Sequence, residues 1–173
     1  SWCLHYLTTE LRRHEKVCGY IYTELQDIEW EHNGMMDYDR SPKTFGYEEL
    51  IPVPEGQPPF SYRDIHSLDF VGINLPPLAA RQPGERMEVT TWISRFSGEG
   101  DETVLVSWRL TGVDAMGQTW RSAGLRTRTS APLWSVSPLA NLAIGPLPKE
   151  PMLYVLCVAA ENPDGNLIAR NFA

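Results

Sequence analysis

The chain has 173 residues, 42% of them hydrophobic and 21% charged, with a formal net charge of −7 and a pI near 5.1. This length allows one large or two small domains, and the composition is ordinary for a globular protein. The acidic charge argues against a nucleic-acid-binding protein, which needs a basic surface. No apolar run approaches the roughly 20 residues of a membrane helix.

The chain begins with two contrasting segments. Trp2, Tyr6, Leu7 and Leu11 have helical spacing, which predicts a helix with one apolar stripe. Residues 17–22, VCGYIY, form a short run rich in β-branched and aromatic side chains, which predicts a strand buried on both faces. A helix followed by such a strand is one step of a barrel, and eight steps are needed to close one.

A polar loop and a proline-rich stretch follow the predicted strand. Asn33-Gly34 indicates a turn, and Ser41-Pro42 indicates the start of a short helix over residues 43–50. Residues 51–59 then hold four prolines in nine positions, which is typical of an extended linker. We therefore place a domain boundary in residues 51–65.

The rest of the chain has the pattern of short strands separated by turn residues. Such spacing predicts a mainly β protein with an antiparallel β-sandwich, immunoglobulin-like or jelly-roll in topology. The expected strands cover residues 67–75, 86–96, 102–113, 118–129, 136–144, 152–160 and 166–172.

Residues 23–43, TELQDIEWEHNGMMDYDRSPK, carry a resemblance to a known family. The segment resembles the last barrel strand and following loop of family-two glycoside hydrolases, the β-galactosidase and β-glucuronidase group. The matching residues are Thr23, Glu24, Asp27, Glu31, Asn33, Gly34, Asp39, Arg40, Pro42 and Lys43. The resemblance implies that residues 1–50 are the last αβ unit of a (β/α)8 barrel, a helix-strand-loop-helix remnant, and that residues 66–173 are an accessory sandwich.

The resemblance also implies a reaction and a division of labour. Family-two enzymes are retaining hydrolases of β-glycosidic bonds, and their two catalytic glutamates follow earlier barrel strands. We therefore expect no catalytic residue here, and we expect the chain to be the C-terminal part of a longer protein, since it lacks an initiator Met. Its implied partners are the remainder of the barrel and a β-glycoside substrate. A homo-oligomer and the compartment are left open.

Four residues of the polar loop are our candidate substrate-binding residues: Glu24, Asp27, Trp30 and Asn33. Glu24 and Asp27 are implied pocket-wall residues that bind sugar hydroxyls, but they could also brace the loop or form a carboxylate pair of their own. An aromatic between two acids suits stacking on a sugar or packing on a neighbouring domain. Many relatives have tryptophan where Thr23 stands, so the sugar specificity does not carry over.

Alternative functions remain at this stage. The chain could be a non-catalytic β-sandwich module that binds carbohydrate or another protein, or a domain that braces a barrel or an oligomer. The tryptophans at 92, 108, 120 and 134 could form a core or a binding platform, and the arginines at 121, 126 and 128 a solvated face. We expect no metal and no cofactor, and we interpret Cys3, Cys18 and Cys157 as small buried hydrophobes.

Overall fold

The computed structural model describes residues 2–46, 48–53, 56–76, 78–124 and 126–173. Three short helices and eight strands are present in this part of the chain. Their bounds are α1 Trp2–Arg12, η1 Glu48–Leu50, α2 Tyr62–Ile65, β1 Asp69–Ile73, β2 Met87–Arg95, β3 Thr103–Val113, β4 Thr119–Ala123, β5 Thr127–Ser130, β6 Ser135–Ile144, β7 Leu153–Glu161 and β8 Leu167–Phe172. No helix among them is long and apolar enough to cross a membrane.

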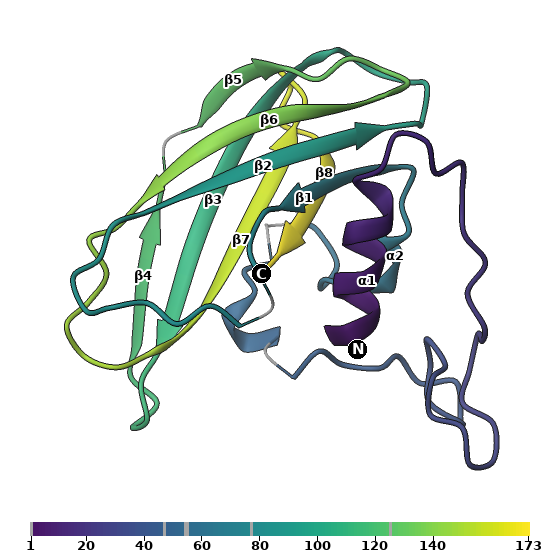
Figure 1. The fold of residues 1–173 in the computed structure, drawn as a ribbon, viewed down its shortest axis with the longest axis horizontal. Helices are drawn as coiled ribbons and strands as arrows, with labels where there is room; N and C mark the ends of the chain where they lie inside the picture. The colour runs from purple at the N-terminus through teal and green to yellow at the C-terminus, as the bar shows by residue number, and fades with distance from the viewer. Residues whose placement is uncertain (1, 47, 54–55, 77, 125) are drawn as a thin grey trace.

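The strands form two antiparallel sheets, which confirms the predicted mainly β sandwich. One sheet has the order β1-β2-β6, and the other has the order β4-β3-β7-β8 with β5 also paired to β3. The pair β2–β6 crosses the pair β3–β7 in Figure 1. Period-two alternation places Val104, Val106 and Leu110 of β3 in the core between the sheets. Val71 and Ile93 face them from the three-stranded sheet.

The predicted strand at 118–129 is two strands in the structure. β4 pairs with residues 109–113 of β3, and β5 pairs with residues 103–106. Gly124 lies against the indole of Trp108, where any Cβ would overlap the ring. Trp108 and Trp120 pack on the core, and Trp92 is buried, whereas Trp134 is exposed. Three of the four sandwich tryptophans therefore have a packing role.

The N-terminal residues cover the outer face of the five-stranded sheet. Phe45, Phe60 and Ile65 pack there against Phe172 of β8, and this cluster is separate from the sandwich core. Helix α1 stands beside β1 and β8 in Figure 1. It buries His5, Thr8 and Thr9, while the side chains at 6, 7 and 11 are exposed. Of the predicted apolar stripe, only Trp2 packs on the cluster around Phe172, and the three exposed members lie outside it.

Two other local predictions are wrong in the described structure. Residues 17–22 have no regular secondary structure and pair with no described strand, and the side chain of Ile21 is 96% exposed. The predicted strand lacks neighbours to hydrogen-bond with, so it does not form. In place of a helix over 43–50 there is the single turn η1, and Ser41 bonds to Asp39 in a turn instead of capping a helix.

The described residues of the stretch at 51–65 pack onto the sandwich. Its end forms α2, where Ser61 and Asp64 make a reciprocal capping box. Asp64 also binds Arg170 of β8, with Nε 2.7 Å from Oδ1. Ile51 and Phe60 are buried. The placement of a domain boundary at this stretch stays a prediction.

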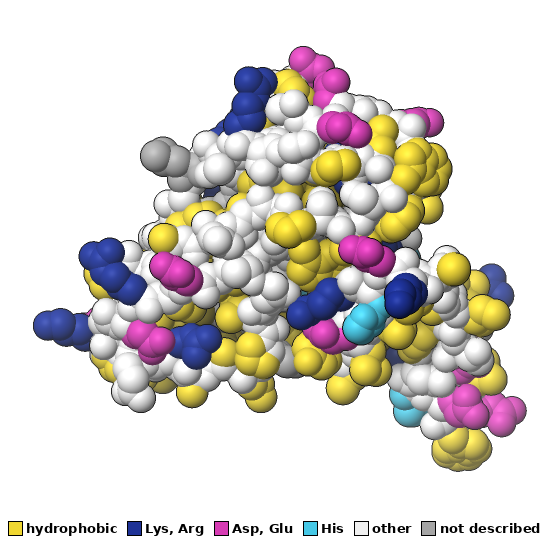
Figure 2. All heavy atoms as spheres, turned by 45° about the horizontal axis from the view of Figure 1, so that its top comes forward, with side chains coloured by type: hydrophobic (Ala, Val, Ile, Leu, Met, Phe, Trp, Pro, Cys, Tyr) yellow, Lys and Arg dark blue, Asp and Glu magenta, His cyan; other side chains and the backbone are white. Residues whose placement is uncertain are grey.

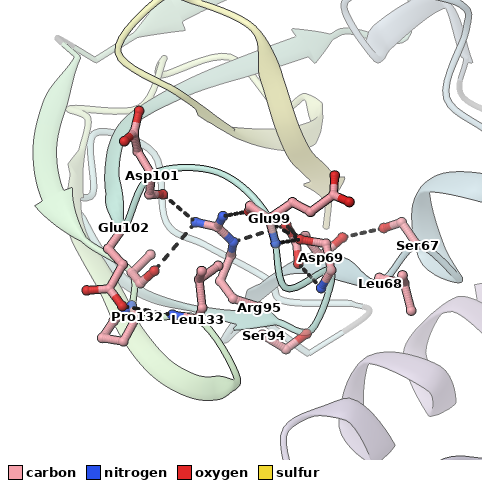
Figure 3. A network of polar contacts seen from close by, with 12 residues as sticks. Ser67, Leu68, Asp69, Ser94, Arg95, Glu99, Asp101, Glu102, Pro132 and Leu133 are labelled. Carbon is pink, nitrogen blue, oxygen red and sulfur yellow. Dashed lines mark hydrogen bonds and ion pairs between the residues drawn. The ribbon is translucent and has the colours of Figure 1, made fainter.

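A buried ion pair fixes one end of the sandwich. Arg95 of β2 is 1% exposed, and its Nε donates to Oδ2 of Asp69 at 3.0 Å. Figure 3 shows the guanidinium between this carboxylate and the backbone carbonyls of Glu99 and Asp101, to which it also donates. Ser97 donates its N–H and its hydroxyl to Asp69. These bonds hold the chain between β2 and β3 in one conformation.

Candidate functional site

Residues 22–43 form a protruding lobe, which we call the 22–43 loop. In Figure 1 it extends away from both sheets at the lower right, and Figure 2 shows hydrophobic, acidic and histidine side chains gathered on that protrusion. Its two arms are joined by backbone bonds from Asp27 to Met36 at 3.0 Å and from Met36 to Leu25 at 3.1 Å. A tight turn between Ile28 and Glu31 closes the tip.

Asp27 is the centre of this loop. Its Oδ1 accepts from the backbone N–H of Gly34 at 2.8 Å and from Nζ of Lys43 at 2.7 Å, and Nδ1 of His32 lies 3.4 Å from Oδ2. Lys43 also donates to the carbonyl of His32 at 2.9 Å. The bond from Lys43, followed by that from Gly34, lowers the pKa of Asp27. The carboxylate is therefore ionised at neutral pH and acts as an acceptor, not as a proton donor.

Gly34 is the residue that allows the arms to meet. A Cβ at this position would overlap the backbone of Gln26 and Asp27. Glycine is used where two backbones must approach this closely. The turn signal Asn33-Gly34 therefore marks a close backbone approach as well as a turn.

The remaining candidate residues differ in exposure. Trp30 is 89% exposed at the tip, between Glu29 and Glu31, which are exposed as well. Asn33 is also exposed, and its Nδ2 donates to the carbonyl of Thr23 at 3.3 Å. Glu24 is half-buried, and its Oε1 has no hydrogen-bond partner among the described residues. The loop thus holds Asp27 inside and presents Trp30 and Asn33 outward.

Sequence reasoning missed the residue that completes this arrangement. Lys43 lies 16 positions from Asp27, and the family motif includes it without indicating that it is the partner of the carboxylate. The available signal was charge: Asp27 was expected in a pocket wall, and a buried carboxylate needs a cation or several donors. The assignment of Glu24, Asp27, Trp30 and Asn33 to substrate binding stays a prediction.

The cysteines lie apart from the 22–43 loop. All three cysteines are free, and Cys3 and Cys18 are exposed, so our interpretation of those two as buried is wrong. No other described segment covers their side chains. Burial raises the pKa of Cys157 to about 12. Within the described ranges no group of three His, Cys, Asp or Glu side chains could hold a metal ion.

The similarity of this chain to known proteins is weak. No protein-family model matches the chain, and no curated protein matches it. Among solved structures, a calcium-binding mutant of Bacteroides uniformis β-glucuronidase 2 is similar with a TM-score of 0.30 and 12% identity. The match covers 63% of this chain and 13% of that one. This neighbour is a glycoside hydrolase, but the likeness is too weak to carry an argument about family or activity.

Proposed function

We propose that this chain is the C-terminal part of a retaining β-glycoside hydrolase. In this proposal, the 22–43 loop forms part of the rim of the sugar pocket, and the sandwich supports it. The observation that carries the proposal is the braced loop itself. Asp27 and Lys43 hold it in shape, and Trp30 stands 89% exposed at its tip between two acids.

Each loop residue has a distinct role in this proposal. The face of an exposed indole stacks on the apolar face of a sugar ring, which suits Trp30. The exposed Asn33 offers its amide group to hydroxyls, and Glu24 has an acceptor to spare in its Oε1, which is buried and has no partner among the described residues. Asp27, with its oxygens occupied, keeps the loop in place. The two carboxylates that do the chemistry, about 5–5.5 Å apart in retaining enzymes, come from outside this chain.

The exposed apolar side chains of the N-terminal region support a large partner. More than half of the exposed large hydrophobic residues described lie between positions 6 and 38, and they include Leu7, Val17 and Ile21. Large hydrophobic side chains exposed in such number in one region of the chain suit an interface. We propose that the remainder of the (β/α)8 barrel covers it and supplies the strands that residues 17–22 lack.

The test uses the complete enzyme that contains this chain, with an aryl β-glycoside as substrate. Replacing Trp30 by alanine should lower kcat/KM about fivefold to tenfold, the loss expected when one stacking contact is removed. The matched control is Trp134→Ala, which removes another exposed indole, 68% exposed, on the sandwich. Equal kcat/KM for Trp30→Ala and the unmodified enzyme would contradict the rim assignment.

A second measurement tests the absence of catalytic residues. The 173-residue chain on its own should show no turnover of the aryl β-glycoside. Turnover above the buffer background that persists after rigorous purification would show that a catalytic carboxylate lies within these residues.

A further inference from the structure

The outer face of the five-stranded sheet carries a cavity of about 340 Å³, far from the 22–43 loop in the chain. Pairing in register places Arg109 opposite Ala123 and Cys157, and places Ala159 opposite Ser107 and Arg170. Small side chains in the middle of these rows leave a hollow on the sheet. Ile51, Pro52 and Phe60 also line it, because the chain before α2 crosses this face.

Arginines surround this hollow, although the chain as a whole carries a charge of −7. Arg109, Arg126 and Arg170 line it, and the register puts Arg121 and Arg128 on the same face in neighbouring rows. Two of the five are neutralised, because Glu161 pairs with Arg126 and Asp64 pairs with Arg170. Arg109 forms no ion pair among the described residues, so the face keeps an excess of positive charge.

Arg170 gives this face the character of a built site. Its side chain is 7% exposed, and Nε and Nη2 are held by both oxygens of Asp64 and by the carbonyls of Pro58 and Pro59. Nη1 has no partner in the described structure. A buried donor without an acceptor costs free energy, and such a group marks the position of a missing partner. The fixed guanidinium is also pre-organised, so little entropy is lost when it binds.

We propose that this cavity binds the oxyanion of a small molecule, with Arg109 and Arg170 as its main donors. Guanidinium groups match carboxylate, sulfate and phosphate oxygens in paired hydrogen bonds. A volume of about 340 Å³ lies at the lower end of the range for small-ligand pockets. The size therefore favours a small anion over a polymer. The site is independent of the proposed sugar pocket and requires no glycosidase activity.

Binding is tested on the full chain by following the side-chain Nε–H signals of its arginines by NMR. The probes are inorganic sulfate, inorganic phosphate, and benzoate with benzyl alcohol as its neutral counterpart. The signals of Arg109 and Arg170 should shift with saturation for at least one anion and not for benzyl alcohol. The anion that binds most tightly identifies the class of oxyanion.

Two exposed arginines on the same face give a matched pair of variants. Arg109→Gln should weaken anion binding about tenfold or more, whereas Arg121→Gln removes the same charge outside the cavity and should change it less than twofold. Arg109→Lys keeps the charge but loses the planar guanidinium that can form two parallel hydrogen bonds to an oxyanion, and it should give an intermediate affinity. Equal losses of anion affinity in Arg109→Gln and Arg121→Gln would overturn the proposal, because they would indicate general attraction by the positive charge of this face and not binding in the cavity. Absence of saturable shifts for every anion would overturn it as well.

Discussion

The imidazole of His5 lies parallel to the phenyl ring of Phe172, with ring centroids 4.6 Å apart and an interplanar angle of 6°. Its Nε2 is 2.6 Å from Oδ1 of Asn171, and Nδ2 of Asn171 donates to the carbonyl of Val71 at 2.8 Å. Since Oδ1 is an acceptor, Nε2 carries the hydrogen in this pair. One histidine thus joins α1 to β8 and, through Asn171, to β1.

This contact predicts that stability falls in mild acid. Burial lowers the pKa of His5 below 6.5, and the hydrogen bond to Asn171 offsets this only in part. Below about pH 6.5 the unfolded chain therefore binds more protons than the folded one. The contribution of neutral His5 to the free energy of unfolding is complete above that pH, and it is lost as the pH falls towards the pKa of His5 in the folded chain. Urea unfolding should show a lower midpoint at pH 5.5 than at pH 7.5.

A second histidine has to be separated from the first. Burial and the charge of Arg12 lower the pKa of His66 as well, so it acts in the same direction. The variant His5→Gln should remove part of the difference between the two pH values, and His66→Gln the rest. If His5→Gln leaves the whole difference in place, the assignment to His5 is wrong.

The buried pair Arg95–Asp69 should be essential to the sandwich. Replacing Arg95 by methionine leaves the carboxylate of Asp69 buried without its cation, and loss of one partner from such a pair costs about 3–5 kcal/mol. The control Arg81→Met breaks a surface pair with Glu85 at 4.0 Å, which should cost no more than about 1 kcal/mol. Chemical denaturation measures both. Similar losses for the two variants would contradict a special role for Arg95.

Gly34 should tolerate no side chain. Gly34→Ala places a methyl group in the backbone of Gln26 and Asp27, so the arms of the 22–43 loop must separate. Gly19→Ala is the matched control, because its methyl group would meet no atom within 4 Å. Hydrogen exchange at the amides of Asp27 and Met36 should be faster in Gly34→Ala and unchanged in Gly19→Ala. Retained protection in Gly34→Ala would show that the loop closes differently.

Asp27 links the brace to the proposed activity. In the complete enzyme, Asp27→Ala should lower kcat/KM, since it releases Lys43 and the amide of Gly34 together. Lys43→Met breaks the same brace from the other side and should act in the same direction. Unchanged kcat/KM in both variants would separate the brace from catalysis.

The thiols should fall into two classes. Cys3 and Cys18 are exposed, whereas the pKa of Cys157 is raised to about 12 by burial. Because the thiolate is the reactive form, iodoacetamide at pH 8 should modify the first two faster than the third in the folded chain, although Cys157 is only partly covered by neighbouring residues. Mass spectrometry of the peptides gives the order. Modification of Cys157 in the native chain as fast as that of Cys3 and Cys18 would contradict its raised pKa.

The strands of the sandwich could be predicted because each signal is local. Alternation of Val104, Val106 and Leu110 shows which face is buried, and turn residues mark where each strand ends. The break between β4 and β5 was not predicted, because the contact beside it is not local: Gly124 lies against the indole of Trp108, 16 positions earlier in the chain.

The N-terminal region was predicted less well because its structure depends on partners. Residues 17–22 have the composition of a buried strand, yet a strand needs a neighbour, and none is present among the described residues. For α1, the predicted stripe includes Leu7 and Leu11, but the surface it meets offers Asn171 and Phe172, so His5 lies inward. The pairing of Asp27 with Lys43 likewise spans 16 positions, and charge alone does not select Lys43 among the cations of the chain.

The two roles of Asp64, in α2 and in the pair with Arg170, affect how the chain folds during translation. This carboxylate caps the four-residue helix α2 and also holds Arg170, 106 positions later. A helix of one turn is not stable by itself. At roughly 5–20 residues per second, the ribosome needs about 5–20 s to travel that distance. During this interval the aromatic rings at 45 and 60 have no Phe172 to pack on, so the beginning of the chain remains unfinished until its end emerges.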